Sequence, residues 1–316
     1  MQEFSALVSA VTTMFLLLII GFIARKLGYM DEKLSKGISN LIICVAQPFM
    51  IIGSIIGIPY SDENIKSGLL ILGISAIVHT IAAVVAFFAT CRFKDVDERR
   101  ITEFGMIFAN NGFLGFPILQ AVFGDIGVFY GSFYIIVFNI VTWTYGMIVL
   151  GKARKQIKMN FKNMIINFGT TPCLIGIALF LLKVKFPEPL MEATNYMGSL
   201  CTPLSMLIIG GLLANIPWNK MFVNLKVYYQ CLVRLIIVPL IVILVTRLLN
   251  LDYTFSLFAA ILAAMPTAAN TSMFAEKYDI KPEYSAHGVG MSTLFSAVTV
   301  PVMMLIAKGL FTAFGG

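Results

Sequence analysis

Two apolar stretches of the chain are interrupted by amide, hydroxyl, glycine and proline residues, the types best suited to bind a solute inside a membrane. The first interruption reads Asn-Asn-Gly-Phe-Leu-Gly-Phe-Pro over residues 110–117, and the second reads Met-Pro-Thr-Ala-Ala-Asn-Thr-Ser over residues 265–272. In lipid an unpaired backbone group costs several kcal/mol, so irregular backbone persists only beside protein or a water-lined cavity. Two interruptions in corresponding positions of two halves therefore predict a solute-binding site.

The first interruption lies at membrane depth if its stretch is a helix. Asn110 follows Arg100 by ten residues, which is roughly 15 Å of helix and reaches the middle of a bilayer core. Gly112 and Gly115 lower the cost of unwinding, and Pro117 removes a backbone donor. We expect the helix to break here.

The second interruption predicts a new helix start. Pro266 precedes Asn270, Thr271 and Ser272, which are good helix N-caps. A helix N-terminus with free N–H groups suits a carboxylate, whereas the carbonyls of a helix C-terminus suit a cation. The alternative is a pair of kinked helices whose amides bond to neighbouring residues.

Composition places these stretches in a membrane protein. Of the 316 residues, 59% are hydrophobic and only 12% are charged, against about a quarter charged in soluble proteins. At about 20 apolar residues per span, the sequence predicts an all-α polytopic protein with ten spans. They cover residues 5–26, 38–58, 68–91, 101–123, 126–150, 164–183, 192–215, 227–249, 254–276 and 285–313.

The basic residues predict the orientation of the spans. Seventeen of the 23 lysines and arginines lie in one set of alternate loops, five lie in the opposite set and one lies inside a span. The positive-inside rule then puts both termini outside and the basic loop 151–163 in the cytoplasm. The net charge of +7 thereby indicates topology rather than a nucleic-acid partner. Five spans per half make residues 1–150 and 164–316 repeats of opposite orientation.

A weaker internal match supports the repeat. Gln47-Pro48 interrupts the second span and Thr202-Pro203 interrupts the seventh, each followed by a glycine-bearing apolar run. Proline is common in membrane helices, so this match gains weight only beside the two interruptions described above.

Few ionisable groups lie inside the predicted spans. Arg234 sits about eight residues into its span, roughly 12 Å deep, where a charge costs at least about 2.5–3.5 kcal/mol. It is either a counter-charge for an anionic substrate, a structural partner of backbone carbonyls or an acid, or a snorkelling side chain. His79 is either a proton relay or a neutral, hydrogen-bonded core histidine. The absence of an acidic residue at any predicted midplane weakens an antiporter built on buried aspartates.

No pattern of catalytic residues, metal ligands or phosphate-binding glycines is present, which argues against an enzyme or an ATP-driven pump. The five cysteines are scattered singly, so packing explains them.

The chain resembles a bacterial member of the auxin efflux carrier family. The resemblance rests on Pro48, on the run at 110–117 and on residues 265–278, which end Ala-Glu-Lys-Tyr. Thr267 departs from relatives that have a second proline there, and the short central loop lacks the regulatory loop of several plant members.

The resemblance implies two inverted five-helix repeats, with a fold similar to that of bile acid:sodium symporters. Spans 1, 2, 6 and 7 would form a scaffold, and spans 3, 4, 5, 8, 9 and 10 a transport bundle that moves like an elevator. Spans 4 and 9 would cross at their breaks and hold the substrate. Bacterial relatives are linked to malate, malonate or other organic acids, and plant relatives to indole-3-acetate.

Together these observations predict a secondary active or potential-driven carrier of small organic anions in the cell (inner) membrane. No cofactor is expected beyond a possible coupling ion, sodium or a proton, and a homodimer through the scaffold is possible. The alternatives are a sodium-coupled symporter or cation/proton antiporter on the same fold, and a non-transporting membrane sensor. The predicted substrate-binding residues are Asn110, Asn111, Gly112, Gly115, Pro117, Pro266, Asn270, Thr271, Ser272, Gln47, Pro48, Thr202, Pro203 and Arg234.

Overall fold

The computed structural model describes residues 2–153, 166, 169–214 and 224–313. Most of the basic loop predicted at 151–163 lies outside the described residues. In the described part of the chain the structure is helical, with no strand beyond one isolated bridge.

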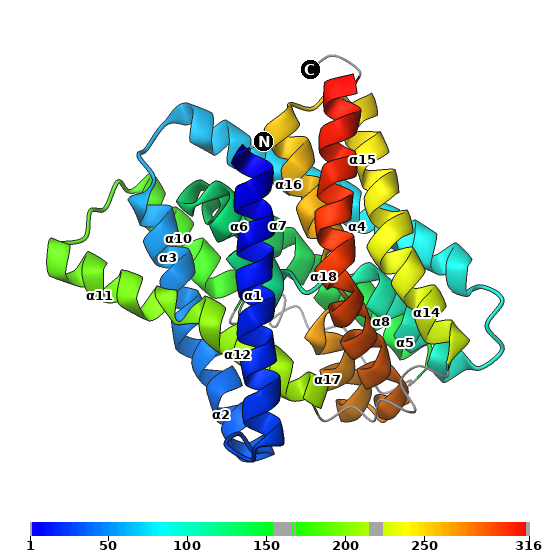
Figure 1. Cartoon of the computed structure of the whole chain (residues 1–316). Helices are drawn as coiled ribbons and strands as arrows, with labels where there is room; N and C mark the ends of the chain where they lie inside the picture. Colours follow the sequence, from blue (N-terminus) through cyan, green and yellow to red (C-terminus); the bar gives the residue numbers. More distant parts are fainter. Residues whose placement is uncertain (1, 154–165, 167–168, 215–223, 314–316) are drawn as a thin grey trace. The chain divides into compact units, whose positions relative to one another are not determined.

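The first half of the chain forms eight α-helices along its described residues (Figure 1). They are α1 (Gln2–Lys26), α2 (Glu32–Leu41), α3 (Gln47–Gly57), α4 (Asp62–Thr90), α5 (Val96–Ile107), α6 (Phe116–Phe123), α7 (Asp125–Val141) and α8 (Met147–Gly151).

The described residues of the second half form eight further α-helices. They are α10 (Thr170–Leu181), α11 (Glu188–Ser199), α12 (Cys201–Ala214), α14 (Leu225–Leu232), α15 (Val238–Leu248), α16 (Tyr253–Ala264), α17 (Ala269–Lys277) and α18 (Pro282–Ala313).

Wide π-helical turns join several of these helices, and three of them immediately precede a helix with proline at its second position. The three turns are Ile42–Ala46, Asn111–Gly115 and Val233–Ile237, followed by Pro48, Pro117 and Pro239; a fourth turn spans Thr142–Gly146. Proline lacks an N–H group and its ring clashes with the carbonyl four residues earlier. A wider turn relieves that clash without ending the helix.

The helices agree with the predicted spans in class and position. Six continuous helical stretches are long and apolar enough to cross a membrane, judged over the residues that the structure describes. They are Glu32–Gly57, Asp62–Thr90, Asp125–Gly151, Glu188–Ala214, Leu225–Leu248 and Pro282–Phe311. Shorter apolar helices cover Asn111–Phe123, Thr170–Leu181 and Tyr253–Ala264. The chain is therefore an all-helical, multi-pass membrane protein, and the ten-span inverted repeat stays a prediction.

The chain divides into two compact units. Unit 1 contains residues 1–73, 112–139 and 162–215, and unit 2 contains residues 74–111, 140–161 and 216–316. The predicted division into repeats and into scaffold and transport bundles stays a prediction.

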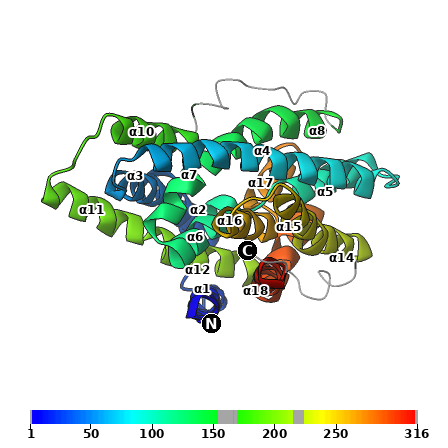
Figure 2. The same cartoon turned by 90° about the horizontal axis from the view of Figure 1, so that it is seen from above.

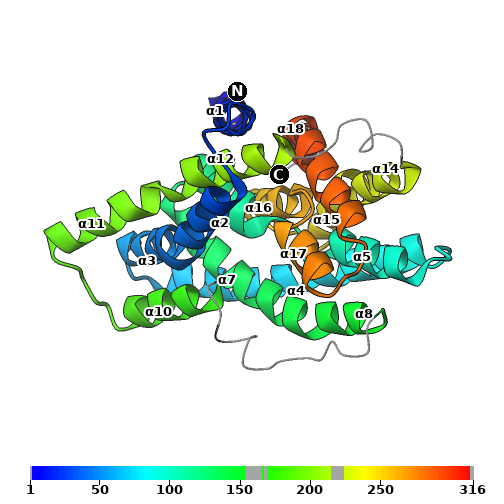
Figure 3. The same ribbon diagram turned by 90° about the horizontal axis from the view of Figure 1, so that it is seen from below.

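Close helix packing holds unit 1 together. Helices α1 and α12 lie side by side (Figure 3), and their backbones meet at glycines. A methyl group on Gly210 would lie 1.9 Å from the carbonyl oxygen of Leu18, and one on Gly21 would lie 2.2 Å from that of Leu207. Helix α3 lies between α10 and α11 (Figure 2).

Unit 2 is built around α16. Nine successive residues of this helix, Ser256–Ala264, are buried, because α15 and α18 pack against it. Helix α5 packs against α14, α17 and α18 in the same unit. An apolar helix buried on all sides is a core element, so α16 presents its C-terminal end to the interior of unit 2.

Candidate functional site

The two predicted interruptions are real breaks, and they lie against each other within unit 2. Helix α5 ends at Ile107, and α16 ends at Ala264. The extended residues that follow form an antiparallel bridge between Ala109 and Thr267. The Asn110 N–H group donates to the Pro266 carbonyl at 2.8 Å, and the Ala268 N–H group donates to the Phe108 carbonyl at 2.9 Å. The freed backbone groups of each break are thus partly satisfied by the other, as a membrane interior requires.

Both segments of the bridge continue as helices directly after it. The π-helical turn Asn111–Gly115 leads into α6, and α17 begins at Ala269. The expectation that Asn270, Thr271 or Ser272 caps α17 is wrong, because the N-cap is Ala268 and no side chain caps the helix there. The bridge fixes Ala268 in extended backbone, so the helix starts earlier and these polar residues fall in its first turn.

Two predicted site residues at the breaks carry buried polar atoms without partners. Asn111 is 3% exposed and Thr271 is 1% exposed. Among the described residues nothing hydrogen-bonds the Asn111 Nδ2 and Oδ1 atoms or the Thr271 Oγ1 atom. An unsatisfied buried polar group costs about 1–3 kcal/mol, and native proteins keep few of them without a functional reason. Other described residues, such as Asn139, also carry such atoms; those of Asn111 and Thr271 differ in standing directly after the breaks.

Arg234 contacts the ends of both broken helices. It lies in the π-helical turn Val233–Ile237 and is 1% exposed. Its nitrogen atoms donate to three carbonyl oxygens: Nε to Met265 at 3.0 Å, Nη1 to Met106 at 3.2 Å and Nη2 to Ala263 at 3.0 Å. All three acceptors are backbone carbonyls. These contacts therefore agree with the interpretation of Arg234 as a structural partner of backbone carbonyls.

Thr267, the departure from the relatives' second proline, is a hydrogen-bonding centre. Its N–H group donates to Ser292 Oγ at 3.1 Å, and its hydroxyl donates to the Gly105 carbonyl at 3.1 Å. The same hydroxyl accepts from Gln230 Nε2 at 3.1 Å. A proline here could make none of these bonds, so the threonine ties the second break to α5, α14 and α18.

The remaining predicted residues of the second break lie near this network. Asn270 and Ser272 are half-buried in the first turn of α17. The Ser272 hydroxyl lies 3.5 Å from the Ser285 hydroxyl on α18.

Other predicted site residues belong to unit 1. Pro48 and Pro117 occupy the second positions of α3 and α6, and Thr202 and Pro203 lie in the first turn of α12. Gln47 is buried, and a methyl group on Gly112 would lie 3.3 Å from its Nε2 atom; Gly115 precedes α6 directly. The structure thus brings Gln47 and Gly112 together, and the facing of these residues toward the breaks of unit 2 stays a prediction.

Three ion pairs that involve residues in or just before α5 were not predicted from the sequence. Glu103 is fully buried and accepts from Arg100 Nη1 at 2.5 Å. Lys281 lies 3.1 Å from Asp95, and Lys226 pairs with Glu98. Arg100 and Glu103 stand three residues apart on a helix, a spacing that allows an ion pair, so the first pair could have been predicted from the sequence. The other two join residues far apart in sequence, which no local pattern indicates.

Asp95 itself caps α5. Its carboxylate accepts from the Glu98 N–H group at 3.0 Å. This hydrogen bond, together with the Lys281 ammonium, holds the pKa of Asp95 below its ordinary value of 3.8.

His79 lies beside the first break, where its ring centroid is 6.4 Å from that of Phe108. It is 3% exposed, and its Nδ1 atom lies 2.7 Å from the Ser75 carbonyl oxygen. A carbonyl only accepts, so Nδ1 carries the proton in this contact. The hydrogen-bonded core histidine is therefore the interpretation that the contact favours.

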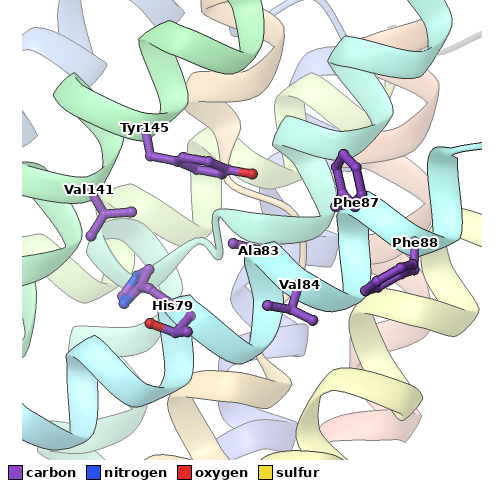
Figure 4. A pocket seen from close by; sticks show the side chains of 8 residues that line it. His79, Ala83, Val84, Phe87, Phe88, Val141 and Tyr145 are labelled. Atoms are coloured by element: carbon purple, nitrogen blue, oxygen red, sulfur yellow. The ribbon is translucent and has the colours of Figure 1, made fainter.

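His79 and Tyr145 border a cavity of about 380 Å³ in unit 2. Figure 4 shows Val84, Phe87 and Phe88 from α4 around it. The walls are mostly apolar, and Asn111, Thr271 and Arg234 are not among them. The cavity is therefore not lined by these three polar side chains, although His79 borders both the cavity and the Phe108 ring of the first break.

No three histidine, cysteine, aspartate or glutamate side chains gather in a metal-binding cluster within the described part of the chain. The polar side chains described at the breaks are neutral amides and hydroxyls together with the Arg234 guanidinium.

Broken helices that meet in the interior of an all-helical, multi-pass protein define a membrane transporter, and comparison with known proteins agrees. Residues 6–304 match the family described as membrane transport protein. The chain belongs to this family, which is that of the auxin efflux carriers, and the resemblance noted from the sequence is confirmed.

Three relatives cover almost the whole chain. An uncharacterised transporter of Methanothermobacter thermautotrophicus is 24% identical over 94% of this chain and 97% of its own length. An uncharacterised transporter of Methanocaldococcus jannaschii is 22% identical over 90% and 94%. A Rhizobium meliloti protein named "Putative malonate transporter" is 19% identical over 94% and 95%.

Proposed function

We propose that the protein is a secondary carrier of small organic anions that works by elevator-type alternating access. The observation that carries the proposal is the position of two buried polar side chains, Asn111 and Thr271, directly after the breaks, with atoms that have no hydrogen-bond partner among the described residues. Each follows a break of a membrane helix by a few residues. A carboxylate substrate would satisfy these amide and hydroxyl groups, because the Asn111 amide can donate up to two hydrogen bonds to its oxygens and the Thr271 hydroxyl can donate one.

Helix electrostatics favour the same substrate class. Helix α17 begins at Ala269 with no side-chain cap, so its first N–H groups and its partial positive charge remain available to an anion. Asn270 stands in this first turn, where its amide would orient the carboxylate. Asn110, Gly112, Gly115, Pro117 and Pro266 shape the breaks in this proposal, and Gln47, Pro48, Thr202 and Pro203 would line the scaffold side.

The relatives narrow the first substrates to test. The Rhizobium meliloti relative carries malonate in its name, so malonate and malate come first, followed by monocarboxylates and indole-3-acetate. In this proposal the protein lies in the cell membrane with both termini non-cytoplasmic, and two copies pair through the scaffold.

Uptake of radiolabelled malonate into proteoliposomes tests the proposal. Asn111→Ala and Asn270→Ala should abolish uptake while the purified proteins stay folded and inserted. Asn64→Ala is the matched control, because this amide lies in the first turn of α4, away from the breaks, and donates to the Pro59 carbonyl at 3.0 Å. Wild-type rates in both site variants would refute the site assignment.

A thermal-shift screen with carboxylates separates the alternatives. A ligand that binds only the folded protein raises its melting temperature by mass action. Stabilisation that accompanies flux identifies a carrier, whereas stabilisation without flux in any gradient identifies a sensor.

A further inference from the structure

The three carbonyl oxygens that Arg234 contacts form a cluster at the ends of two helices. Met106 lies in the last turn of α5, Ala263 lies in the last turn of α16, and Met265 directly follows α16. The last four carbonyls of a helix have no partner within it and carry the negative end of its dipole. The cluster therefore attracts a positive charge.

Carbonyl clusters of this kind hold the coupling cation in carriers with broken helices. Here the position is filled by the chain itself, because Arg234 sends a separate nitrogen to each of the three oxygens at 3.0–3.2 Å. The guanidinium is 1% exposed, so little room is left for water or a hydrated ion beside it.

We propose that Arg234 is the resident cation of the carrier and takes the place of a coupling sodium ion between the two broken helices. This inference rests on the proposed transport function and deepens it, since it states how the anion moves: without a metal cation bound at the breaks. Arg234 is a positioning residue in this account, because it acts through the two helix ends.

The charge balance shows what the resident cation does for the substrate. Each helix C-terminus carries about half a negative charge, so the ends of α5 and α16 together offset the single charge of Arg234. Within the same unit, helix α17 resumes at Ala269 and keeps its positive end of about half an elementary charge. That end attracts a carboxylate. With an exchangeable sodium ion, anion binding would depend on sodium; with a fixed arginine it does not.

The experiment compares sodium, lithium and choline chloride in two readouts, melting temperature and anion uptake. Wild-type protein should give the same values in all three salts. Arg234→Met removes the charge but keeps a long side chain; its uptake should fall at least about tenfold in choline. Its melting temperature should rise as sodium or lithium replaces choline, because the vacated carbonyls bind the ion.

Two further variants control the result. Arg234→Lys restores a cation and should recover part of the uptake without a sodium response. Arg247→Met removes another arginine, one that lies over the Phe311 ring, and should behave like wild type.

Three outcomes would overturn the inference: a sodium-dependent rise in the melting temperature of the wild type, a folded Arg234→Met protein that ignores sodium and lithium, or full uptake by that variant in choline. If Arg234→Met does not fold, a sodium response of the wild type or of Arg234→Lys still refutes it, and its absence in both supports it. The melting arm needs no substrate, so failure of the proposed transport function remains distinguishable.

Discussion

Removing the unpartnered polar atoms at the breaks should separate transport from stability. Asn111→Leu and Thr271→Val replace these side chains by apolar ones of nearly the same shape. The lost atoms have no hydrogen-bond partner among the described residues. The substitutions therefore remove no hydrogen bond that stabilises the folded protein. Removal of a buried unsatisfied group lowers a cost of about 1–3 kcal/mol, so each variant should be as stable as wild type or more so.

Transport should fall in the same variants. A hydrogen bond to a charged group is worth about 1.5–3 kcal/mol, and about 1.4 kcal/mol corresponds to a tenfold change in binding. Each substitution should therefore weaken malonate binding roughly ten- to hundredfold. The assay combines uptake as a function of malonate concentration in proteoliposomes with melting temperatures in detergent.

Thr246→Val is the matched control, because the Thr246 hydroxyl is also buried but donates to the Ile243 carbonyl at 3.0 Å. This variant should lose some stability and keep its transport. The reasoning is refuted if Asn111→Leu and Thr271→Val lose stability as Thr246→Val does, since their polar atoms would then have structural partners. It is equally refuted if both variants bind and carry malonate as wild type does.

Three further predictions concern the framework. Gly210→Ala should destabilise the protein by about 1–3 kcal/mol, because its methyl group meets the Leu18 carbonyl at 1.9 Å. Gly73→Ala, with nothing within 4 Å of its methyl group, should not, and melting temperatures compare the two. Thr267→Pro should lower the melting temperature more than Thr267→Val, because only proline removes the buried N–H donor. Asp95 has a lowered pKa, so its contribution to stability is full above its ordinary pKa and lost as pH falls through the folded-state value; melting scans from pH 7 to pH 3 should show a smaller loss in Asp95→Asn.

Much of the fold could be predicted from the sequence because membrane helices are long and their breaks carry local signals. Asn110 and Pro266 mark where α5 and α16 give way to extended backbone. Pro48 and Pro117 indicate irregular helix, but only the structure shows π-helical turns before them. The start of α17 at Ala269 was not predictable, because the bridge to a residue 158 positions earlier sets it.

The polar partners of the site were less predictable for the same reason. Arg234 was recognised as an intramembrane charge, and its sequence neighbours left its role open among several interpretations. Its acceptors are backbone carbonyls of α5 and of the end of α16. Every residue has a backbone carbonyl, so residue types cannot indicate which ones Arg234 contacts. Glu103 lies near the start of a predicted span, where an acidic residue gives no sign of burial, yet it is fully buried.

The contrast between Thr267 and Thr271 shows how one short segment can be both framework and site. Thr267 uses its N–H group and its hydroxyl in three hydrogen bonds to Ser292, Gly105 and Gln230, which over-determine the position of the break. Thr271 follows four residues later, in the first turn of α17, and is as deeply buried, yet its hydroxyl bonds to nothing in the part of the chain that the structure describes. An unsatisfied hydroxyl is costly in an apolar interior, so a ligand that bonds the Thr271 hydroxyl would recover that cost. A rigid bridge that holds an unsatisfied group in place is the arrangement expected of a preorganised binding site.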